Sequence, residues 1–302
     1  MAILRTFIII ALLLWLSIRG IQKKSLSYSG ALAAVVLGGI IFSHPSPVFG
    51  SLLLTFYLSS SKLTKFKCEI KKQLEENHLE GGQRNAVQVL SNGLTGMILC
   101  CLHWRWISQT VDGTAHSPKT NALIQAALFA YIGHFACCNG DTWASELGVL
   151  SRSNPILITT FQTVPKGTNG GVSAFGTAAA IVGGLCVGTA AAVTLYLETT
   201  FMGRPSSPIG ILVLIGAAAG FGGSMIDSLL GATLQKSIFN KDKKQIVQDH
   251  RVLKAGESPE SFKHISGLAL LDNHQVNFAS SLITATATGV FGYWLYTTGV
   301  SR

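Results

Sequence analysis

Residues 122–148 read ALIQAALFAYIGHFACCNGDTWASELG, an apolar run that ends in a short polar motif. The run from 122 to 138 has no charged residue. A helix that crosses a bilayer needs about 20 largely apolar residues, with a range of about 17–25. We therefore predict a transmembrane helix here, with Asp141 and Glu146 just beyond its apolar part.

Apolar runs recur along the whole chain of 302 residues, of which 48% are hydrophobic and only 12% charged. Soluble domains have about 25% charged residues, so the composition argues against a soluble fold. The other runs lie at 2–18, 31–42, 48–60, 86–104, 172–197, 208–234 and 276–300. The short runs at 31–42 and 48–60 are two thin spans or one re-entrant hairpin, and we favour two spans. The sequence predicts an all-α, polytopic transmembrane helix bundle of about eight spans, with residues 1–302 forming one integral membrane domain.

Basic residues fall mainly on one side of these predicted spans. The segments 19–28, 62–85, 152–171 and 235–265 share one side and contain 18 of the 23 lysines and arginines, against 5 on the other side. Because basic loops tend to stay in the cytosol, we expect these segments to be cytosolic and both termini to face the lumen or exterior. Topology therefore explains the net charge of +9, and no nucleic-acid partner is expected. We expect the endoplasmic reticulum or another endomembrane.

Amides and one cation open two of the spans. Arg84, Gln88 and Asn92 precede or begin the fourth span at a spacing of four residues, so they are expected to share one helical face. A cation and two amides facing lipid would be unfavourable, so they should face a ligand cavity or hydrogen-bond between helices. Asn273 and Asn277 open the eighth span one turn apart.

Three carboxylates lie near the predicted cytosolic ends of the fifth and seventh spans: Asp141, Glu146 and Asp227. An ionisable residue inside a membrane is a functional hypothesis by default. Carboxylate oxygens suit Mg²⁺, which commonly takes one or two carboxylates together with phosphate oxygens. We predict that these three residues hold Mg²⁺, and the alternative is a buried ion pair with Arg152 or Lys166.

The loop 165–173, PKGTNGGVS, leads into the sixth span. Glycines let the backbone approach a ligand, and the N-terminus of the following helix offers unpaired N–H groups to an anion. The loop does not match G-x-x-x-x-G-K-[ST], so it is not a Walker loop. The predicted phosphate-binding residues are Lys166, Gly167, Thr168, Asn169, Gly170, Gly171 and Ser173.

All of these clusters lie at the predicted cytosolic ends of spans four to eight. Polar residues with purely structural roles would not be expected to gather at one membrane face, so we favour an enzyme that handles a phosphorylated molecule with a metal. A transporter of a small or phosphorylated solute is the alternative, because carriers also use intramembrane acids and broken helices. A carrier site should, however, lie near the midplane. A scaffolding protein would leave the acids unexplained.

The motifs resemble those of the transmembrane protein 19 family, which includes the plant phytyl-phosphate kinase and many prokaryotic membrane proteins. The resemblance runs from about Gly30 to the eighth span and is closest to an animal member. It is carried by RNAVQVLSNG at 84–93, NGDTWASELG at 139–148, KGTNGGVS at 166–173, GSMIDSLLGA at 223–232 and DNHQVN at 272–277. It implies transfer of the γ-phosphoryl group of a nucleoside triphosphate, with CTP favoured, to an isoprenyl monophosphate, giving the diphosphate.

The residue roles follow from chemistry. Phosphoryl transfer needs mostly positioning and charge neutralisation, so we assign Asp141, Asp227 and Lys166 to catalysis. The amides, Arg84 and the loop 165–173 would bind substrate and nucleotide. The isoprenyl tail is expected in a groove between glycine-rich spans, with the lipid bilayer, the isoprenyl phosphate and the nucleotide as partners.

The topology is testable by glycosylation mapping. An N-glycosylation acceptor inserted within 241–254 should stay unmodified in microsomes because this loop is predicted to be cytosolic. An acceptor inserted within 105–121 should be modified and serves as the control. Glycosylation of the first acceptor would overturn the predicted orientation.

Overall fold

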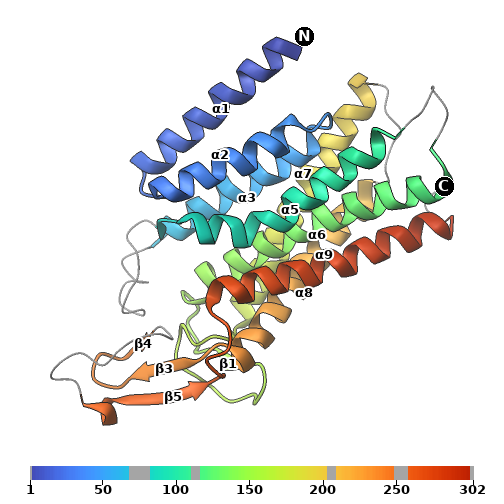
Figure 1. Ribbon diagram of the computed structural model, residues 1–302. Coiled ribbons are helices and arrows are strands. Elements are labelled where there is room, and N and C mark those ends of the chain that lie inside the picture. The colour runs from blue at the N-terminus through green and yellow to red at the C-terminus, as the bar shows by residue number, and fades with distance from the viewer. Residues whose placement is uncertain (1, 68–81, 110–115, 203–208, 248–257, 300–302) are drawn as a thin grey trace.

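The computed structural model describes residues 2–67, 82–109, 116–202, 209–247 and 258–299, and within these ranges its long elements are helices (Figure 1). Parts of two predicted cytosolic loops, 68–81 and 248–257, lie outside the described residues. Eight long helices follow the eight apolar runs: α1 Ala2–Gln22, α2 Tyr28–Ser43, α3 Val48–Lys65, α5 Ala86–Ile107, α6 Pro118–Gly148, α7 Ala174–Met202, α8 Ile209–Leu234 and α9 Asn273–Thr297. The prediction of an all-α polytopic bundle is confirmed.

Several of these helices are long and apolar enough to cross a membrane. The five candidate spans in the described ranges are Ile3–Gln22, Ala86–Ile107, Pro118–Gly148, Ala174–Phe201 and Gly210–Leu234. Helix α2 is apolar but shorter, with 16 residues. Residues 31–60 form two helices that pack mostly on different neighbours, since α2 lies on α1 and α5 whereas α3 lies on α6 and α7.

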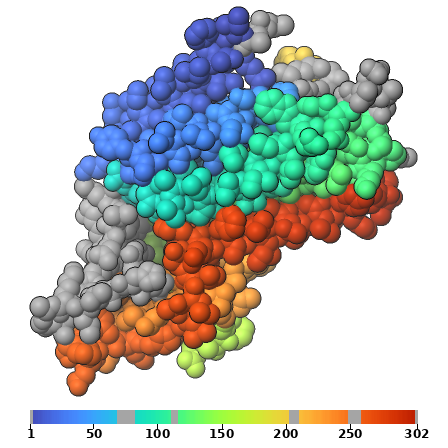
Figure 2. All heavy atoms as spheres, viewed as in Figure 1, coloured from blue at the N-terminus to red at the C-terminus, as the bar shows by residue number. Residues whose placement is uncertain are grey.

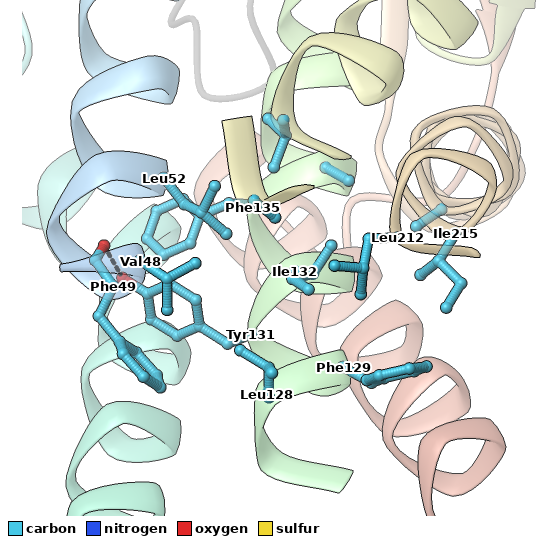
Figure 3. Packing of buried hydrophobic residues seen from close by; sticks show 14 of the residues in the cluster. Val48, Phe49, Leu52, Leu128, Phe129, Tyr131, Ile132, Phe135, Leu212 and Ile215 are labelled. Atoms are coloured by element: carbon cyan, nitrogen blue, oxygen red, sulfur yellow. Dashed lines mark hydrogen bonds between the residues drawn. The ribbon is translucent and has the colours of Figure 1, made fainter. Parts of the chain in front are cut away.

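Helix α6 is the central element, packed against α3, α5, α7, α8 and α9. Its stretch from Ala127 to Gly140 is buried throughout. Figure 3 shows Tyr131 and Phe135 of α6 beside Phe49 of α3, and the Tyr131 hydroxyl donates a hydrogen bond of 2.6 Å to the Phe49 carbonyl oxygen. The hydroxyl of a buried tyrosine usually has a hydrogen-bond partner, so this bond allows Tyr131 to lie in an otherwise apolar core.

Glycines bring the backbones of α6, α7 and α8 into direct contact. A Cβ atom at Gly184 of α7 would clash with the Gly216 carbonyl oxygen of α8, and one at Gly140 of α6 would lie 2.8 Å from the Gly220 Cα. Small residues allow such approach where lipid supplies no hydrophobic drive between helices. Backbone therefore fills the space between α7 and α8 at these glycines, and the predicted groove for a lipid tail between the glycine-rich spans does not lie at these positions.

Short strands, which the sequence did not predict, lie at the end of the bundle opposite to both termini (Figure 1). Strands β1 and β2 pair antiparallel, and a second antiparallel sheet has the order β4-β3-β5. The bounds are β1 Ile156–Leu157, β2 Gly171–Val172, β3 Ser237–Asn240, β4 Gln245–Val247 and β5 Phe262–Ser266, with a 3₁₀ turn at Pro259–Ser261. The turn after α1 and the connections after α6 and α8 also lie at this end. The predicted basic, cytosolic segments include the same three connections. We call this end of the bundle the loop end.

The helix contact through glycine is testable with a matched pair of variants. Gly184→Ala should destabilise the protein by about 1–3 kcal/mol because overpacking forces backbone shifts. Gly222→Ala, on α8 with nothing within 4 Å of the added Cβ, should be neutral or mildly stabilising. Thermal unfolding in detergent, followed by tryptophan fluorescence, measures both. Equal melting temperatures for the two variants would contradict the close contact.

Candidate functional site

Asp141 of α6 and Asp227 of α8 line one small pocket. The Ser224 hydroxyl donates to Asp141 Oδ1 at 3.3 Å, and the Ser280 hydroxyl of α9 donates to Asp227 Oδ2 at 2.9 Å. The lining residues are Asn92, Cys137, Cys138, Asp141, Thr142, Asp227, Asn277 and Ser280. Two acids that are far apart in sequence thus face one space, which four helices enclose.

The local sequence explains how the two acids come to face each other. Asp141 directly follows Gly140, where α6 touches α8, and a Cβ at Gly223 would clash with the Cys137 side chain. Side chains one turn further along each helix must therefore share the gap between α6 and α8. Asp141 and Asp227 each lie seven residues before the last residue of their helix, or about 10 Å from the loop end.

Asn277 joins this pocket from α9. With its amide oriented to satisfy its neighbours, the side-chain nitrogen donates to Asp227 Oδ2 at 3.3 Å and to the Asn273 carbonyl oxygen at 3.1 Å. Asp272 precedes it as the N-cap of α9, in a capping box with Gln275. Of the two asparagines that were predicted to bind substrate or nucleotide, Asn277 therefore contacts an acid of the pocket, and Asn273 does not line it.

The pocket has the donor set of a hard-cation site. Its lining has two carboxylates and the oxygens of Thr142, Ser280 and Asn277, and among the described residues it includes no lysine, arginine or histidine. Two like charges in a partly enclosed site are unfavourable unless a cation or a proton compensates them. Mg²⁺ prefers oxygen ligands and often takes one or two carboxylates plus phosphate oxygens, so the residues present fit it.

Glu146, the third predicted metal ligand, does not line this pocket. Within the described ranges, no group of three His, Cys, Asp or Glu residues could hold a metal ion. The residue lies five positions after Asp141 on a regular helix, which turns its side chain toward another neighbour. Burial lowers the pKa of the Arg84 guanidinium, and Tyr57 and Glu146 oppose this shift. Glu146 thus lies outside the pocket that the two aspartates share, and its charge acts on Arg84.

The expectation that Arg84 shares a helical face with Gln88 and Asn92 is wrong, because α5 begins only at Ala86. Arg84 instead forms a parallel backbone bridge with Leu26. Ser27 N donates to its carbonyl oxygen at 2.9 Å. Its side chain runs beside the Phe56 ring, with Cζ 5.8 Å from the ring centroid, and donates to the Ser61 hydroxyl at 3.0 Å.

Gln88 and Asn92 also have local partners. Gln88 completes a capping box with Asn85 at the start of α5, and the Asn92 amide donates to the Gln88 carbonyl oxygen at 3.1 Å. Together with Arg84 they nevertheless line a second, apolar cavity between α1, α2, α3 and α5. The structure therefore brings the three residues together, although by a different local geometry.

The loop 165–173 packs on the turn of α8 that follows Asp227. At Gly170, with φ +77°, a Cβ would lie 2.5 Å from the Ser228 carbonyl oxygen, so packing alone requires glycine there. Lys166 donates through Nζ to the Ser151 carbonyl oxygen, and Ser173 Oγ accepts a bond of 3.1 Å from Gly176 N near the start of α7. The loop borders the turn beside the acid pocket, but its residues are not among those that line it.

The other members of this predicted loop have structural partners. The Thr168 hydroxyl donates to the Pro165 carbonyl oxygen at 2.7 Å, and Asn169 N donates to the Ser237 hydroxyl at 3.1 Å. Gly167 has φ +85°, a conformation that favours glycine, and Gly171 begins β2. A phosphate-binding role for these residues stays a prediction.

Sequence reasoning missed several residues of the pocket. Ser224 and Ser280 hold the carboxylates, and Thr142, Cys137 and Cys138 complete the wall. A signal was present, since Ser224 and Ser280 each lie three positions from a predicted site residue and so on nearly the same helical face.

Comparison with known proteins finds similar chains in a plant and in prokaryotes. The chain is 38% identical to Protein PGR of Arabidopsis thaliana over 93% of this chain and 94% of that protein. It is 30% identical to an uncharacterized membrane protein of Methanocaldococcus jannaschii over 80% of this chain and 88% of that protein. With Protein VTE6, chloroplastic, of Arabidopsis thaliana the identity is 27% over 70% of this chain and 56% of that protein.

No solved structure matches the chain. The family described as integral membrane protein DUF92 matches residues 11–285, which is most of the sequence and includes α2 to α8 and the first half of α9. The chain therefore belongs to the integral membrane protein family DUF92.

Proposed function

We propose that this protein is a membrane-embedded kinase that transfers the γ-phosphoryl group of a nucleoside triphosphate, with CTP the first candidate, to an isoprenyl monophosphate. The observation that carries the proposal is the pair Asp141 and Asp227, which face one pocket that has no basic residue in its lining within the described part of the chain. The motif resemblance to a family that includes the plant phytyl-phosphate kinase supplies the substrate class. The proposed location is the endoplasmic reticulum or another endomembrane.

Asp141 and Asp227 would hold Mg²⁺ through their carboxylates, with phosphate oxygens as further ligands. Bound there, the ion would neutralise charge on the transferring phosphoryl group. The Ser224 and Ser280 hydroxyls each donate to one carboxylate and so fix its orientation. A positioned pair of carboxylates meets the main requirement of phosphoryl transfer, in which the protein positions and stabilises charge rather than reacting covalently.

The acceptor needs little activation. An oxygen of the isoprenyl monophosphate would attack the γ-phosphorus, and the bond from that phosphorus to the β,γ-bridging oxygen would break, with its electron pair leaving on the nucleoside diphosphate. Because the attacking oxygen is already anionic, a general base is not required. Arg84 would bind the acceptor phosphate, since guanidinium and phosphate geometries match.

The nucleotide would approach from the loop end. There the loop 165–173 lies against the Ser228 carbonyl, one residue beyond Asp227. Lys166 in this loop would provide a point charge to the nucleotide phosphates, and Gly167 and Gly170 would provide backbone N–H groups, since those of Thr168, Asn169 and Gly171 are bonded within the protein. The acids lie about 10 Å from the helix ends rather than near the middle of the helices, which favours an enzyme over a carrier with a midplane site.

Substitution of either acid tests the metal-binding role. Asp141→Asn and Asp227→Asn should each lower Mg²⁺-dependent formation of diphosphate from CTP and phytyl or geranylgeranyl monophosphate by at least about 100-fold, because an amide is a far weaker Mg²⁺ ligand than a carboxylate. Product formation by purified protein in nanodiscs is the measurement. Asp272→Asn, which retains an N-cap side chain, should stay within about twofold of the parent and is the control. Full turnover by either pocket variant would refute the assignment.

Substitution of the loop lysine tests the nucleotide-binding role. Lys166→Ala should raise the KM for CTP by about 10-fold or more while changing the KM for the lipid phosphate little, because one charged hydrogen bond to phosphate is lost. Lys241→Ala, in the turn between β3 and β4 at the loop end, is the matched control. If KM for CTP is unchanged and the variant folds, the loop serves packing alone.

A further inference from the structure

An apolar cavity lies between α1, α2, α3 and α5, apart from the acid pocket. Its enclosed volume is about 90 Å³, and it opens partly to the surroundings, so it has the form of an apolar groove. Figure 2 shows α1, α2, α5 and α9 side by side across one face of the molecule, so three of the four helices that line this cavity lie at the surface of the bundle.

The cavity is long and has chemically different ends. At the loop end its wall includes Arg84, Gln88 and Asn92. Away from that end the wall is almost wholly hydrocarbon, and it extends to Gly38 and Phe42 near the end of α2. The Arg84 carbonyl oxygen lies against Gly30, and twelve residues of α2 separate Gly30 from Phe42, or about 18 Å along the helix.

Arg84 is held in place by backbone bonds but keeps donors for a ligand. Its backbone N donates to the Ser25 carbonyl oxygen at 3.0 Å, and its carbonyl oxygen accepts from Ser27 N. Among the described residues, the side chain makes one hydrogen bond, to the Ser61 hydroxyl. A guanidinium has five N–H donors in a planar fork, so it can bind a phosphate bidentately while it keeps Ser61.

The cavity and the acid pocket meet at one residue. Asn92 lines both. Its carbonyl oxygen contacts His134 Nε2 at 2.9 Å, which fixes α5 against α6 at this point. An anionic head at Arg84 would therefore face Asp141 and Asp227 across Asn92, and an attached hydrocarbon chain would run away from the acids.

We propose that the cavity between α1, α2, α3 and α5 binds the hydrocarbon chain of a single-chain lipid monophosphate, with its phosphate on Arg84. The proposal rests on the proposed function for the identity of the lipid, and it assigns the tail to the N-terminal helices rather than to the glycine-rich α7 and α8. Chain length is expected to matter because the lining of the cavity ends at Phe42 on α2 and at Leu53 on α3. The positive charge of Arg84 favours a lipid whose head group is a negatively charged phosphate.

Narrowing the far end of the cavity tests the position of the tail. Gly38→Leu adds bulk inside the cavity toward the Leu13 side chain, whereas at Gly39 an added Cβ would have only a Leu13 side-chain atom, at 3.9 Å, within 4 Å. Binding of radiolabelled geranylgeranyl monophosphate to protein in nanodiscs, measured without nucleotide, should weaken about 10-fold in Gly38→Leu and stay within about twofold in Gly39→Leu. Binding of the shorter geranyl monophosphate should change less than about twofold in both.

A second pair covers the case in which Gly38→Leu does not fold. Leu53→Trp on α3 also narrows the far part of the cavity, and Leu58→Trp on the same helix changes an exposed side chain and serves as its control. Equal loss of affinity for the long and the short lipid in Leu53→Trp, or no loss for either, would overturn the assignment of the cavity to the tail.

Removing the charge tests the position of the head. Arg84→Gln should weaken binding of geranylgeranyl monophosphate by about 10-fold or more, because the phosphate loses its charged hydrogen bonds. Binding of geranylgeraniol should weaken by less than about twofold, because this alcohol has no phosphate and makes no such bonds. Equal weakening of both ligands would show that Arg84 acts only through packing and would overturn the head assignment. Competition by phosphatidic acid as strong as that by the isoprenyl phosphate would overturn the single-chain specificity.

Failure of this inference differs from failure of the proposed function. Binding that depends on chain length and on Arg84, without any turnover of CTP, would support the cavity and reject the kinase. Turnover that is insensitive to Gly38→Leu and Leu53→Trp at every chain length would support the kinase and reject the cavity.

Discussion

Contact between the backbones of α6, α7 and α8 sets the position of the two carboxylates in the acid pocket. A Cβ at Gly183 would lie 3.0 Å from the Gly140 Cα, and one at Gly220 would lie 2.7 Å from the Gly184 Cα. At such separations no side chain can stand between the helices, so Asp141 and Asp227 are held at the edge of this contact. Asn139 strengthens it, because its amide donates to the Gly183 carbonyl oxygen at 2.8 Å while hydroxyls of α3 donate to its Oδ1.

The far end of the bundle is closed by a different kind of contact. The Ser46 hydroxyl donates to Glu198 Oε2 at 2.8 Å, and His44 Nε2 contacts His103 Nδ1 at 3.1 Å. Arg5 of α1 donates to the carbonyl oxygen of Phe42 at 3.3 Å, and Phe42 also lines the apolar cavity. Buried polar groups are stable when they are paired in this way. The polar residues Arg84, Gln88 and Asn92 line the cavity at its opposite end.

The sequence predicted the helices well because each apolar run is long and continuous, and because the bilayer admits few other structures. It predicted that Asp141 and Asp227 would meet, since an isolated carboxylate in lipid is unfavourable. It could not place Glu146, whose orientation depends on where α6 lies against its neighbours. Arg84 was misassigned because a capping box at Asn85, rather than hydrophobic periodicity, determines where α5 begins. The strands were not predicted because they are too short to show a clear alternation of apolar and polar residues.

The length of α6 has a consequence for where the chemistry can occur. Its 31 residues extend for about 46 Å, whereas the hydrocarbon layer of a bilayer is about 30 Å thick. If the excess of about 16 Å is shared between the two ends, Asp141, about 10 Å from the loop end, lies at the boundary between hydrocarbon and headgroups. A water-soluble and a lipid-soluble reactant can then meet at one plane, and neither has to leave its own solvent.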